Sequence, residues 1–236
     1  MKWKNYWAGA KEGMPVCVGY FSVSFGFGTL AISEGLRVLD AVLMSATNLT
    51  SAGQFAGVTL IAAAATLVEM FMTQLVINSR YALMSLALGQ RLGTEMGVGQ
   101  RMLIAFFNTD EIFALAMRRR EPLDLPFMLG AGSVAFVGWV SGTLMGALAG
   151  TILPPSLQSA MGVLLYGMFI AIVVPQVKAS KACLVSMLIA IAASSLFQWA
   201  PVLNRVSPGI AMVAATVLAA GRCALLFPVR DEEEET

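Results

Sequence analysis

Histidine is absent from this sequence of 236 residues, and charged residues make up only 12% of it. Without histidine the chain cannot form a zincin motif, a histidine-based triad or a c-type haem attachment site. Its three cysteines, Cys17, Cys183 and Cys223, lie in apolar runs, so we expect packing residues rather than disulfides or metal ligands. No nucleophile accompanies a base in an evident arrangement, so we expect neither an enzyme nor a cofactor. A net charge of +1 gives no basic face for nucleic acid.

Apolar residues, in contrast, are abundant: they make up 58% of the chain, and the mean hydropathy is +0.77. Soluble domains carry about 25% charged residues, so this composition indicates a protein of the lipid bilayer. A helix needs about 20 apolar residues to cross the hydrocarbon layer. Eight segments qualify, at about 14–33, 38–57, 58–80, 101–118, 126–150, 155–177, 180–200 and 208–228. We predict an all-α integral membrane protein with seven or eight transmembrane helices, at least one of them broken or re-entrant.

Lysine and arginine set the expected orientation, because cytoplasmic loops carry an excess of both. Eight crossings place four basic sites on the cytoplasmic side: Lys2 to Lys11, Arg118 to Arg120, Lys178 with Lys181, and Arg230. Four arginines fall outside, so the bias has exceptions: Arg37, Arg91, Arg101 and Arg205. We expect a cytoplasmic lead-in at 1–13, a single transmembrane domain at 14–228 and an acidic cytoplasmic tail at 229–236.

Polar residues interrupt the apolar segments in three places, all before the arginine run. The first is SATNLTSAGQFAG, residues 45–57. Serine, threonine and asparagine compete with the helical backbone for hydrogen bonds, so this stretch is expected to be broken. Broken membrane helices expose N–H and carbonyl groups that can hold a substrate. Contacts between helices would use the same residue types, and whether 38–57 crosses or re-enters stays open.

The other two interruptions carry charge. Asn78-Ser79-Arg80-Tyr81 is followed by nine further residues without charge, so Arg80 lies inside an apolar stretch or snorkels to the interface. Glu69 lies eleven residues earlier, about 16 Å along a helix, too far for direct pairing. Asp110 and Glu111 follow Asn108 and Thr109, and they point about 100° apart on a helix. Two adjacent acids in this setting favour a cavity-lining patch.

Small residues and a repeated spacing complete the picture. Gly138, Gly142 and Gly146 form a small-xxx-small ladder suited to close helix packing. Pro15, Gly19 and Phe25 recur with the same separations as Pro126, Gly130 and Phe136, which hints at an internal parallel repeat. Arg222, in the last apolar run, can snorkel or pair, and the sequence does not decide between the two.

Several ordered motifs resemble the AzlC family, the large subunit of bacterial branched-chain amino acid exporters. They are P-x-x-x-G-Y-x-x-x-x-F-G from Pro15, S-A-G-Q-F at 51–55, N-S-R-Y at 78–81 and T-D-E-I-F-A at 109–114. Tyr81 stands where the family often has histidine, so an imidazole proton relay there is absent. The resemblance implies an inner-membrane exporter of leucine, isoleucine, valine and often methionine. It implies proton drive and a small hydrophobic AzlD-type subunit as partner. No P-loop motif is present, which agrees with a secondary transporter.

A zwitterionic cargo with an apolar side chain needs a cation or helix N-terminus, an acid or carbonyls, and an apolar pocket. The predicted substrate-binding residues share this chemistry: Ser51, Gly53, Gln54, Phe55, Asn78, Arg80, Phe107, Asn108 and Asp110. The predicted proton carriers are the acids of the apolar segments, Glu69, Asp110 and Glu111. Two alternatives stay open. One is an assembly subunit whose partner holds the transport path, and the other is an exporter of another small amino acid or amine.

Overall fold

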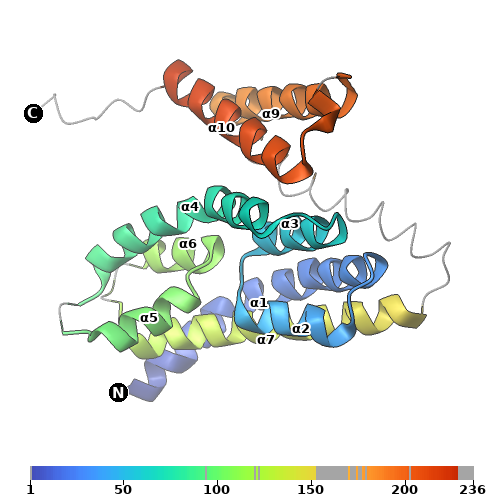
Figure 1. The fold of residues 1–236 in the computed structure, drawn as a ribbon. Coiled ribbons are helices and arrows are strands. Elements are labelled where there is room, and N and C mark those ends of the chain that lie inside the picture. The colour runs from blue at the N-terminus through green and yellow to red at the C-terminus, as the bar shows by residue number, and fades with distance from the viewer. Residues whose placement is uncertain are drawn as a thin grey trace, which may run out of the picture. The chain divides into compact units, whose positions relative to one another are not determined.

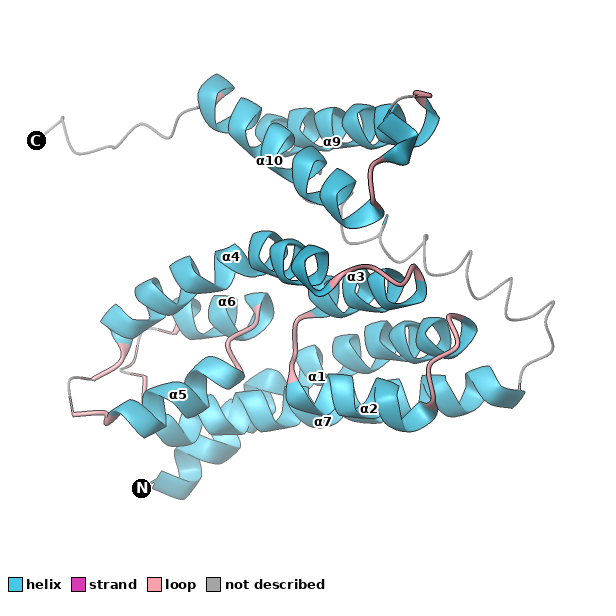
Figure 2. Ribbon diagram, in the orientation of Figure 1, coloured by secondary structure: helices cyan, strands magenta, loops and turns pink. Residues whose placement is uncertain are grey.

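The computed structural model describes residues 2–93, 95–119, 121, 123–152, 180–201 and 203–227, with isolated positions at 170, 174, 177 and 178. These residues form helices and connecting loops and no strand (Figure 2). Four of the described helices are long and apolar enough to cross a membrane: α1 (Lys2–Ser33), α7 (Leu125–Ile152), α9 (Lys181–Trp199) and α10 (Pro208–Leu226). The predicted all-α membrane fold is confirmed. The segment at 155–177 and the acidic tail lie outside the described residues, apart from the isolated positions.

The chain divides into two compact units. The first comprises Met1–Val58 and Ile77–Leu165, and the second comprises Thr59–Val76 and Tyr166–Thr236. The prediction of one transmembrane domain over 14–228 therefore stays a prediction. Every predicted site residue except Glu69 belongs to the first unit.

The centre of the first unit is the pair of long helices α1 and α7. Gly130 of α7 packs on Tyr6, Gly138 on Cys17 and Gly146 on Phe25, so the contacts advance along both helices in the same direction. A Cβ atom at any of these glycines would clash with the α1 backbone. The predicted glycine ladder is confirmed as the surface on which two parallel helices approach closely.

The repeated proline and glycine spacing does not mark equivalent positions in these two helices. Pro15 lies in the interior of α1, whereas Pro126 is the second residue of α7. Gly130 is packed against the backbone of α1, while a Cβ atom added at Gly19 would meet nothing within 4 Å. The two helices do run parallel, as that repeat requires.

The segment at 38–57 folds back on itself rather than running straight. Helix α2 (Val38–Thr47) ends at Asn48, and α3 (Ser51–Ala62) begins three residues later. Gln54 Nε2 donates to Ser45 Oγ at 3.0 Å. In one continuous helix these residues would lie about 13 Å apart along the axis, so the contact requires a reversal. We call α2 and α3 the first hairpin (Figure 1).

The segment at 101–118 is also a hairpin, which corrects the expectation that it is one crossing. Both arms of this hairpin contact helix α4 (Leu67–Arg91), so their directions can be compared along it. Helix α5 (Val98–Phe106) runs against it, because Arg101 donates to the Gly89 carbonyl and Asn108 to Ser85. Helix α6 (Asp110–Arg118) then returns along the same stretch of α4. We call α5 and α6 the second hairpin.

The second unit contains α9, a 3-10 turn at Leu203–Arg205, α10 and the first turns of α4. Serine caps both long helices: the Ser180 hydroxyl accepts from Cys183 N–H, and the Ser207 hydroxyl accepts from Ile210 N–H. Thr73 of α4 donates its hydroxyl to the Gly209 carbonyl at 3.4 Å. Arg222 is exposed on α10.

Candidate functional site

The tips of the two hairpins meet at a cleft of about 220 Å³ in the first unit, lined by both polar and apolar side chains. One side is formed by Thr47 to Thr50 of the first tip, and the other by Asn108, Thr109 and their neighbours in the second. Tyr81 and Ser85 of α4 complete the lining with Ala105 and Phe106. Figure 1 shows the hairpins entering the unit from opposite ends, so the tips lie near its middle. The cleft is smaller than the sites of about 300–1,000 Å³ that hold drug-sized ligands, which suits a small molecule.

The first tip breaks because its polar side chains take over backbone hydrogen bonds. Asn48 Nδ2 donates to the Met44 carbonyl at 2.8 Å and so caps the end of α2. The Asn48 Oδ1 atom accepts from Thr50 N–H at 3.4 Å. These are the local bonds by which asparagine competes with the helix, as the composition of residues 45–57 predicted.

The second tip leaves a buried acceptor without a partner. Asn108 is only 4% exposed, and its Nδ2 donates to Ser85 Oγ at 3.1 Å. Its Oδ1 atom is buried and has no hydrogen-bond partner among the described residues. A buried polar atom in this state costs roughly 1–3 kcal/mol unless water or a ligand satisfies it. Asn108 itself lines the cleft.

Arg80 and Asp110 form an ion pair beside the cleft, each next in sequence to a lining residue. Their side chains are 43% and 45% exposed, so the pair remains open to solvent or ligand. The Arg80 guanidinium also lies over the Tyr81 ring, 5.1 Å from its centroid. Two predicted site residues therefore neutralise each other, which leaves Arg80 less free to hold a cargo carboxylate.

Glu111 has a different partner. Its Oε2 atom accepts a hydrogen bond of 2.5 Å from the hydroxyl of Tyr20, which is buried on α1. The Tyr20 ring packs edge-on against Trp139 of α7 at 5.3 Å. In the sequence, Tyr20 was noted only as part of the motif that begins at Pro15. Nothing in the sequence predicted a contact between Tyr20 and Glu111, which is 91 residues away.

Gln54 lies in the core and away from the cleft. It is 2% exposed, its Nε2 donates to Ser45, and its Oε1 accepts from Trp139 Nε1 at 2.8 Å. Ser45 in turn shares a hydrogen bond of 2.7 Å with Thr143. Because both ends of the Gln54 amide are occupied, this network joins the first hairpin to α7.

The remaining predicted substrate residues are spread over the two hairpins and α4. Phe55 is buried against Phe27 at 5.5 Å, and Phe107 packs on Phe106 and Phe136. Ser51 opens α3 and is half-buried, Gly53 is buried, and Asn78 is half-buried on α4. None of these five lines the cleft, whereas Asn108 does.

Glu69 has a structural place at the start of α4. Its Oε2 accepts from Thr66 N–H at 2.7 Å, and Thr66 Oγ1 accepts from Glu69 N–H at 3.3 Å. This is a capping box, in which a threonine and a glutamate three residues later satisfy each other's backbone donors. The sequence T-L-V-E carries that signature, so this role was readable before the structure.

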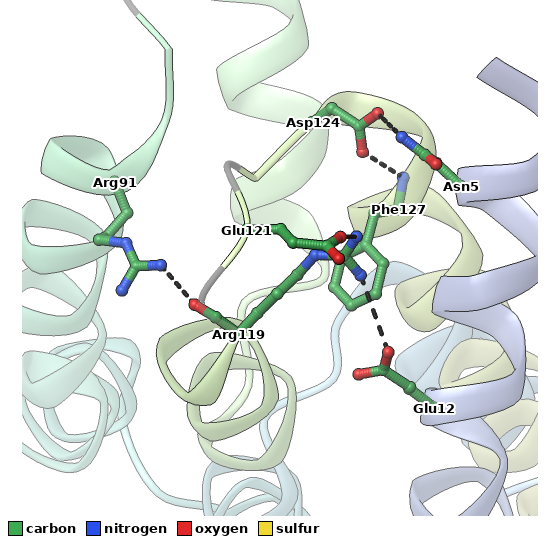
Figure 3. Close-up of polar contacts among 7 residues, drawn as sticks. All are labelled: Asn5, Glu12, Arg91, Arg119, Glu121, Asp124 and Phe127. Atoms are coloured by element: carbon green, nitrogen blue, oxygen red, sulfur yellow. Dashed lines mark hydrogen bonds and ion pairs between the residues drawn. The ribbon is translucent and has the colours of Figure 1, made fainter. Parts of the chain in front are cut away.

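A second charged cluster surrounds Arg119 at the other end of the second hairpin (Figure 3). Its guanidinium pairs with Glu121 and with Glu12 of α1, and lies 3.9 Å from the Phe127 ring centroid. The Arg119 carbonyl accepts from Arg91 at 2.6 Å. The arginine run, expected to mark topology, therefore also ties α1, α4 and α7 together where α6 ends.

A cleft of about 550 Å³ lies in this region, and its lining is mostly charged: Ala8, Glu12, Leu115, Arg118, Arg119 and Glu121. Beside it, Asp124 caps α7 by accepting from Phe127 N–H, and it also accepts from Asn5 of α1 at 2.5 Å (Figure 3). In the described residues no group of three histidine, cysteine or acidic side chains could hold a metal ion.

The fold and the cleft define the class: a polytopic helical membrane protein with two helical hairpins whose tips meet at a cleft. The family model described as AzlC protein matches residues 15–153, more than half of the sequence, so the chain belongs to the AzlC family. The match contains both hairpins and the whole cleft.

Two relatives are membrane proteins by name. The inner membrane protein YgaZ of Escherichia coli (strain K12) is 28% identical over 174 residues, 71% of this chain and 71% of its own length. An uncharacterized membrane protein of Archaeoglobus fulgidus is 30% identical over 166 residues, 70% of this chain and 72% of its own. No solved structure matches the chain.

Proposed function

We propose that this chain is the large subunit of a secondary transporter that exports branched-chain amino acids. Its cargo is leucine, isoleucine and valine, with methionine as a further candidate. The observation that carries the proposal is the cleft between two hairpin tips, lined by polar and apolar side chains and beside the Arg80–Asp110 ion pair. Half-helices that end near the middle of a bundle are a recurrent way for transporters to hold small polar cargo.

The cleft offers the chemistry that this cargo needs. Asn108 Oδ1 is a hydrogen-bond acceptor without a partner among the described residues, and an ammonium group can donate to it. Asp110 adds negative charge on the same side, at the first residue of α6. Leu49, Ala105 and Phe106 supply the apolar part of the lining for the cargo side chain.

The proton driving force requires a carboxyl group that can gain and lose a proton, and Glu111 is the best candidate. Protonating Asp110 would break an ion pair, whereas protonating Glu111 only rearranges its hydrogen bond with the Tyr20 hydroxyl. Glu69, the third predicted carrier, is occupied in the capping box of α4. Glu111 therefore takes the role that sequence analysis divided among three acids.

The proposed setting is the bacterial cytoplasmic membrane, with both termini in the cytoplasm and a small AzlD-type subunit as partner. No residue of α9 is buried, and its exposed apolar side chains include Leu184, Leu188, Ile191 and Leu196. Lipid and the small subunit would cover this surface. The apolar content of 58% agrees with an environment that hides such faces from water.

The test is efflux from cells that lack their own exporters. Cells are loaded with a leucine- or valine-containing dipeptide, and external amino acid is followed with this chain alone, with its small partner, and with Asp110→Asn. Faster efflux that is lost in an expressed and assembled mutant supports the exporter. If the mutant instead fails to assemble, the acid belongs to a subunit contact. A stable complex without efflux of any branched-chain residue or methionine excludes this cargo.

A further inference from the structure

The two hairpins and the helices before them repeat one arrangement with reversed direction. Within the first unit, α1 precedes the first hairpin and α4 precedes the second. Glu111 contacts Tyr20 and Arg119 contacts Glu12, so α6 runs antiparallel to α1. Because α6 pairs with Arg80 at its start and meets Arg91 at its end, α4 runs the same way as α6.

The remaining helices follow the same rule. Helix α2 starts where α1 ends and runs back along α7, since Ser45 bonds Thr143 while Ile32 lies at Gly150. Helix α5 runs against α4 and therefore parallel to α1. Each helix of α4–α6 thus points opposite to its counterpart in α1–α3. This is the geometry of an inverted-topology repeat.

The sequence carries the same correspondence. Tyr20, Ser24 and Gly28 of α1 match Tyr81, Ser85 and Gly89 of α4, each pair separated by 61 residues. The tips match as well: Asn48 and Thr50 correspond to Asn108 and Thr109, with Leu49 as the one extra residue in the first tip. In both halves the threonine immediately precedes the returning half-helix.

We propose that α1–α3 and α4–α6 are inverted repeats. We further propose that the carboxylate of the cargo binds at the start of α3, in the position equivalent to that of the Glu111 carboxylate at the start of α6. This inference rests on the proposed amino acid cargo. Glu111 is the second residue of α6, and the tyrosine of the opposite half, Tyr20, donates to it. The second residue of α3 is Ala52, and Tyr81 lines the cleft beside Thr50.

The two half-helix starts differ in charge. Helix α6 begins with Asp110 and Glu111, so its positive N-terminal end is already neutralised by the protein. The first turn of α3 carries no acidic residue. An anion is favoured at such an end because of the positive end of the helix dipole, although Ser51 N–H already donates to the Leu49 carbonyl at 3.1 Å. The free carboxylate of an amino acid supplies the negative charge that one repeat has and the other lacks.

An independent observation indicates where the other end of the ligand lies. The buried Asn108 Oδ1 atom belongs to the opposite tip, lines the same cleft and has no described partner. A cargo with its carboxylate at α3 would present its ammonium group to this tip, where Asn108 Oδ1 accepts. Tyr81, which stands where the AzlC family often has histidine, then donates its hydroxyl to the carboxylate as Tyr20 does to Glu111.

The experiment places a tethered carboxylate in the proposed position. Ala52→Glu gives α3 the acid that α6 has, and Ala52→Gln adds the same length without charge. Binding of radiolabelled L-leucine and the leucine-induced rise in melting temperature are measured on the purified full-length chain. L-leucinamide, which lacks the carboxylate, is used as a competitor.

We expect A52E to weaken leucine binding by at least about tenfold and to abolish the thermal shift, and A52Q, which fills the same space without charge, to weaken binding by a smaller factor. Leucinamide should compete poorly against wild type. Unchanged leucine binding in both A52E and A52Q would overturn the carboxylate assignment, and so would strong competition by leucinamide. Wild-type protein that binds no branched-chain residue or methionine, with or without its small partner, would instead remove the proposed function and this inference with it.

Discussion

Arg80 on α4 and Asp110 at the start of α6 form an ion pair between residues 30 positions apart, and each side chain remains close to half exposed. Exposed pairs contribute only about 0–1 kcal/mol to stability, so the pair is a poor explanation for folding. Under the proposed function, its position beside the cleft between the hairpin tips would let it contact charged cargo.

Replacing Asp110 with asparagine should therefore leave the fold intact and lower transport. We expect efflux to fall by at least about tenfold, while the free energy of unfolding changes by less than about 1 kcal/mol. Efflux and melting temperature are measured on the same preparation. Asp40→Asn, at an exposed pair with Arg37 at the start of α2, is the matched control. An Asp110 variant that transports normally would remove the pair from the mechanism.

Glu111→Gln should uncouple transport from protons. The amide keeps a hydrogen bond with Tyr20 but cannot exchange a proton, so leucine–leucine exchange should persist while stimulation by an acidic exterior is lost. Proteoliposomes with imposed pH gradients separate the two activities. Glu95→Gln, an exposed loop residue, should behave as wild type. Retained proton stimulation in E111Q would reassign the carrier.

Gln54→Leu should destabilise the protein, because it leaves Ser45 and Trp139 without their amide partner in the core. We expect a loss of about 1–3 kcal/mol in unfolding free energy. Leucine affinity of the folded fraction should stay near wild type, since Gln54 does not line the cleft. Gln100→Leu, exposed on α5, is the control. If Gln54→Leu lost leucine affinity while its stability stayed unchanged, Gln54 would have to be assigned to the binding site.

Two glycines of α1 should respond differently to alanine. A Cβ at Gly28 would meet the backbone of Thr143 and Ala147 on α7, whereas nothing lies within 4 Å of one at Gly19. Overpacking of this kind costs about 1–3 kcal/mol, so Gly28→Ala should lower the melting temperature and Gly19→Ala should not. Equal effects would mean that α1 and α7 pack on another face.

Arg119 and its neighbour Arg118 provide a second test residue and matched control. Arg119 is 11% exposed and holds Glu12, Glu121 and the Phe127 ring, while Arg118 is exposed. Arg119→Met leaves Glu12 and Glu121 without their cation, but both acids are more than half exposed, so together with the lost contact to the Phe127 ring the change should cost about 1–2 kcal/mol. Arg118→Met should have little effect on thermal stability. Comparable melting curves for both variants would contradict a stabilising role for the contacts of Arg119.

Sequence reasoning identified the polar interruptions but not all of their roles. Asn108 and the acids after it were expected at the site, and Asn108 does line the cleft. Gln54 has the same polar chemistry and was placed there too, yet it lies in the core. Polarity alone cannot separate the two cases, because a glutamine whose partners come from α2 and α7 looks the same in sequence as one that faces a ligand.

The sequence by itself determined that the chain is a helical membrane protein, because hydropathy and helix-breaking residues are local properties. It also determined where the first hairpin breaks, since asparagine, serine and threonine at 45–51 compete with the backbone. The break at 108–109 was not expected, because 101–118 was predicted as one crossing. Only the tertiary structure decided that both breaks reverse the chain, that their tips meet, and that Glu111 faces Tyr20. A three-residue break permits either continuation or reversal, and the choice depends on partners such as Trp139, 85 residues from Gln54.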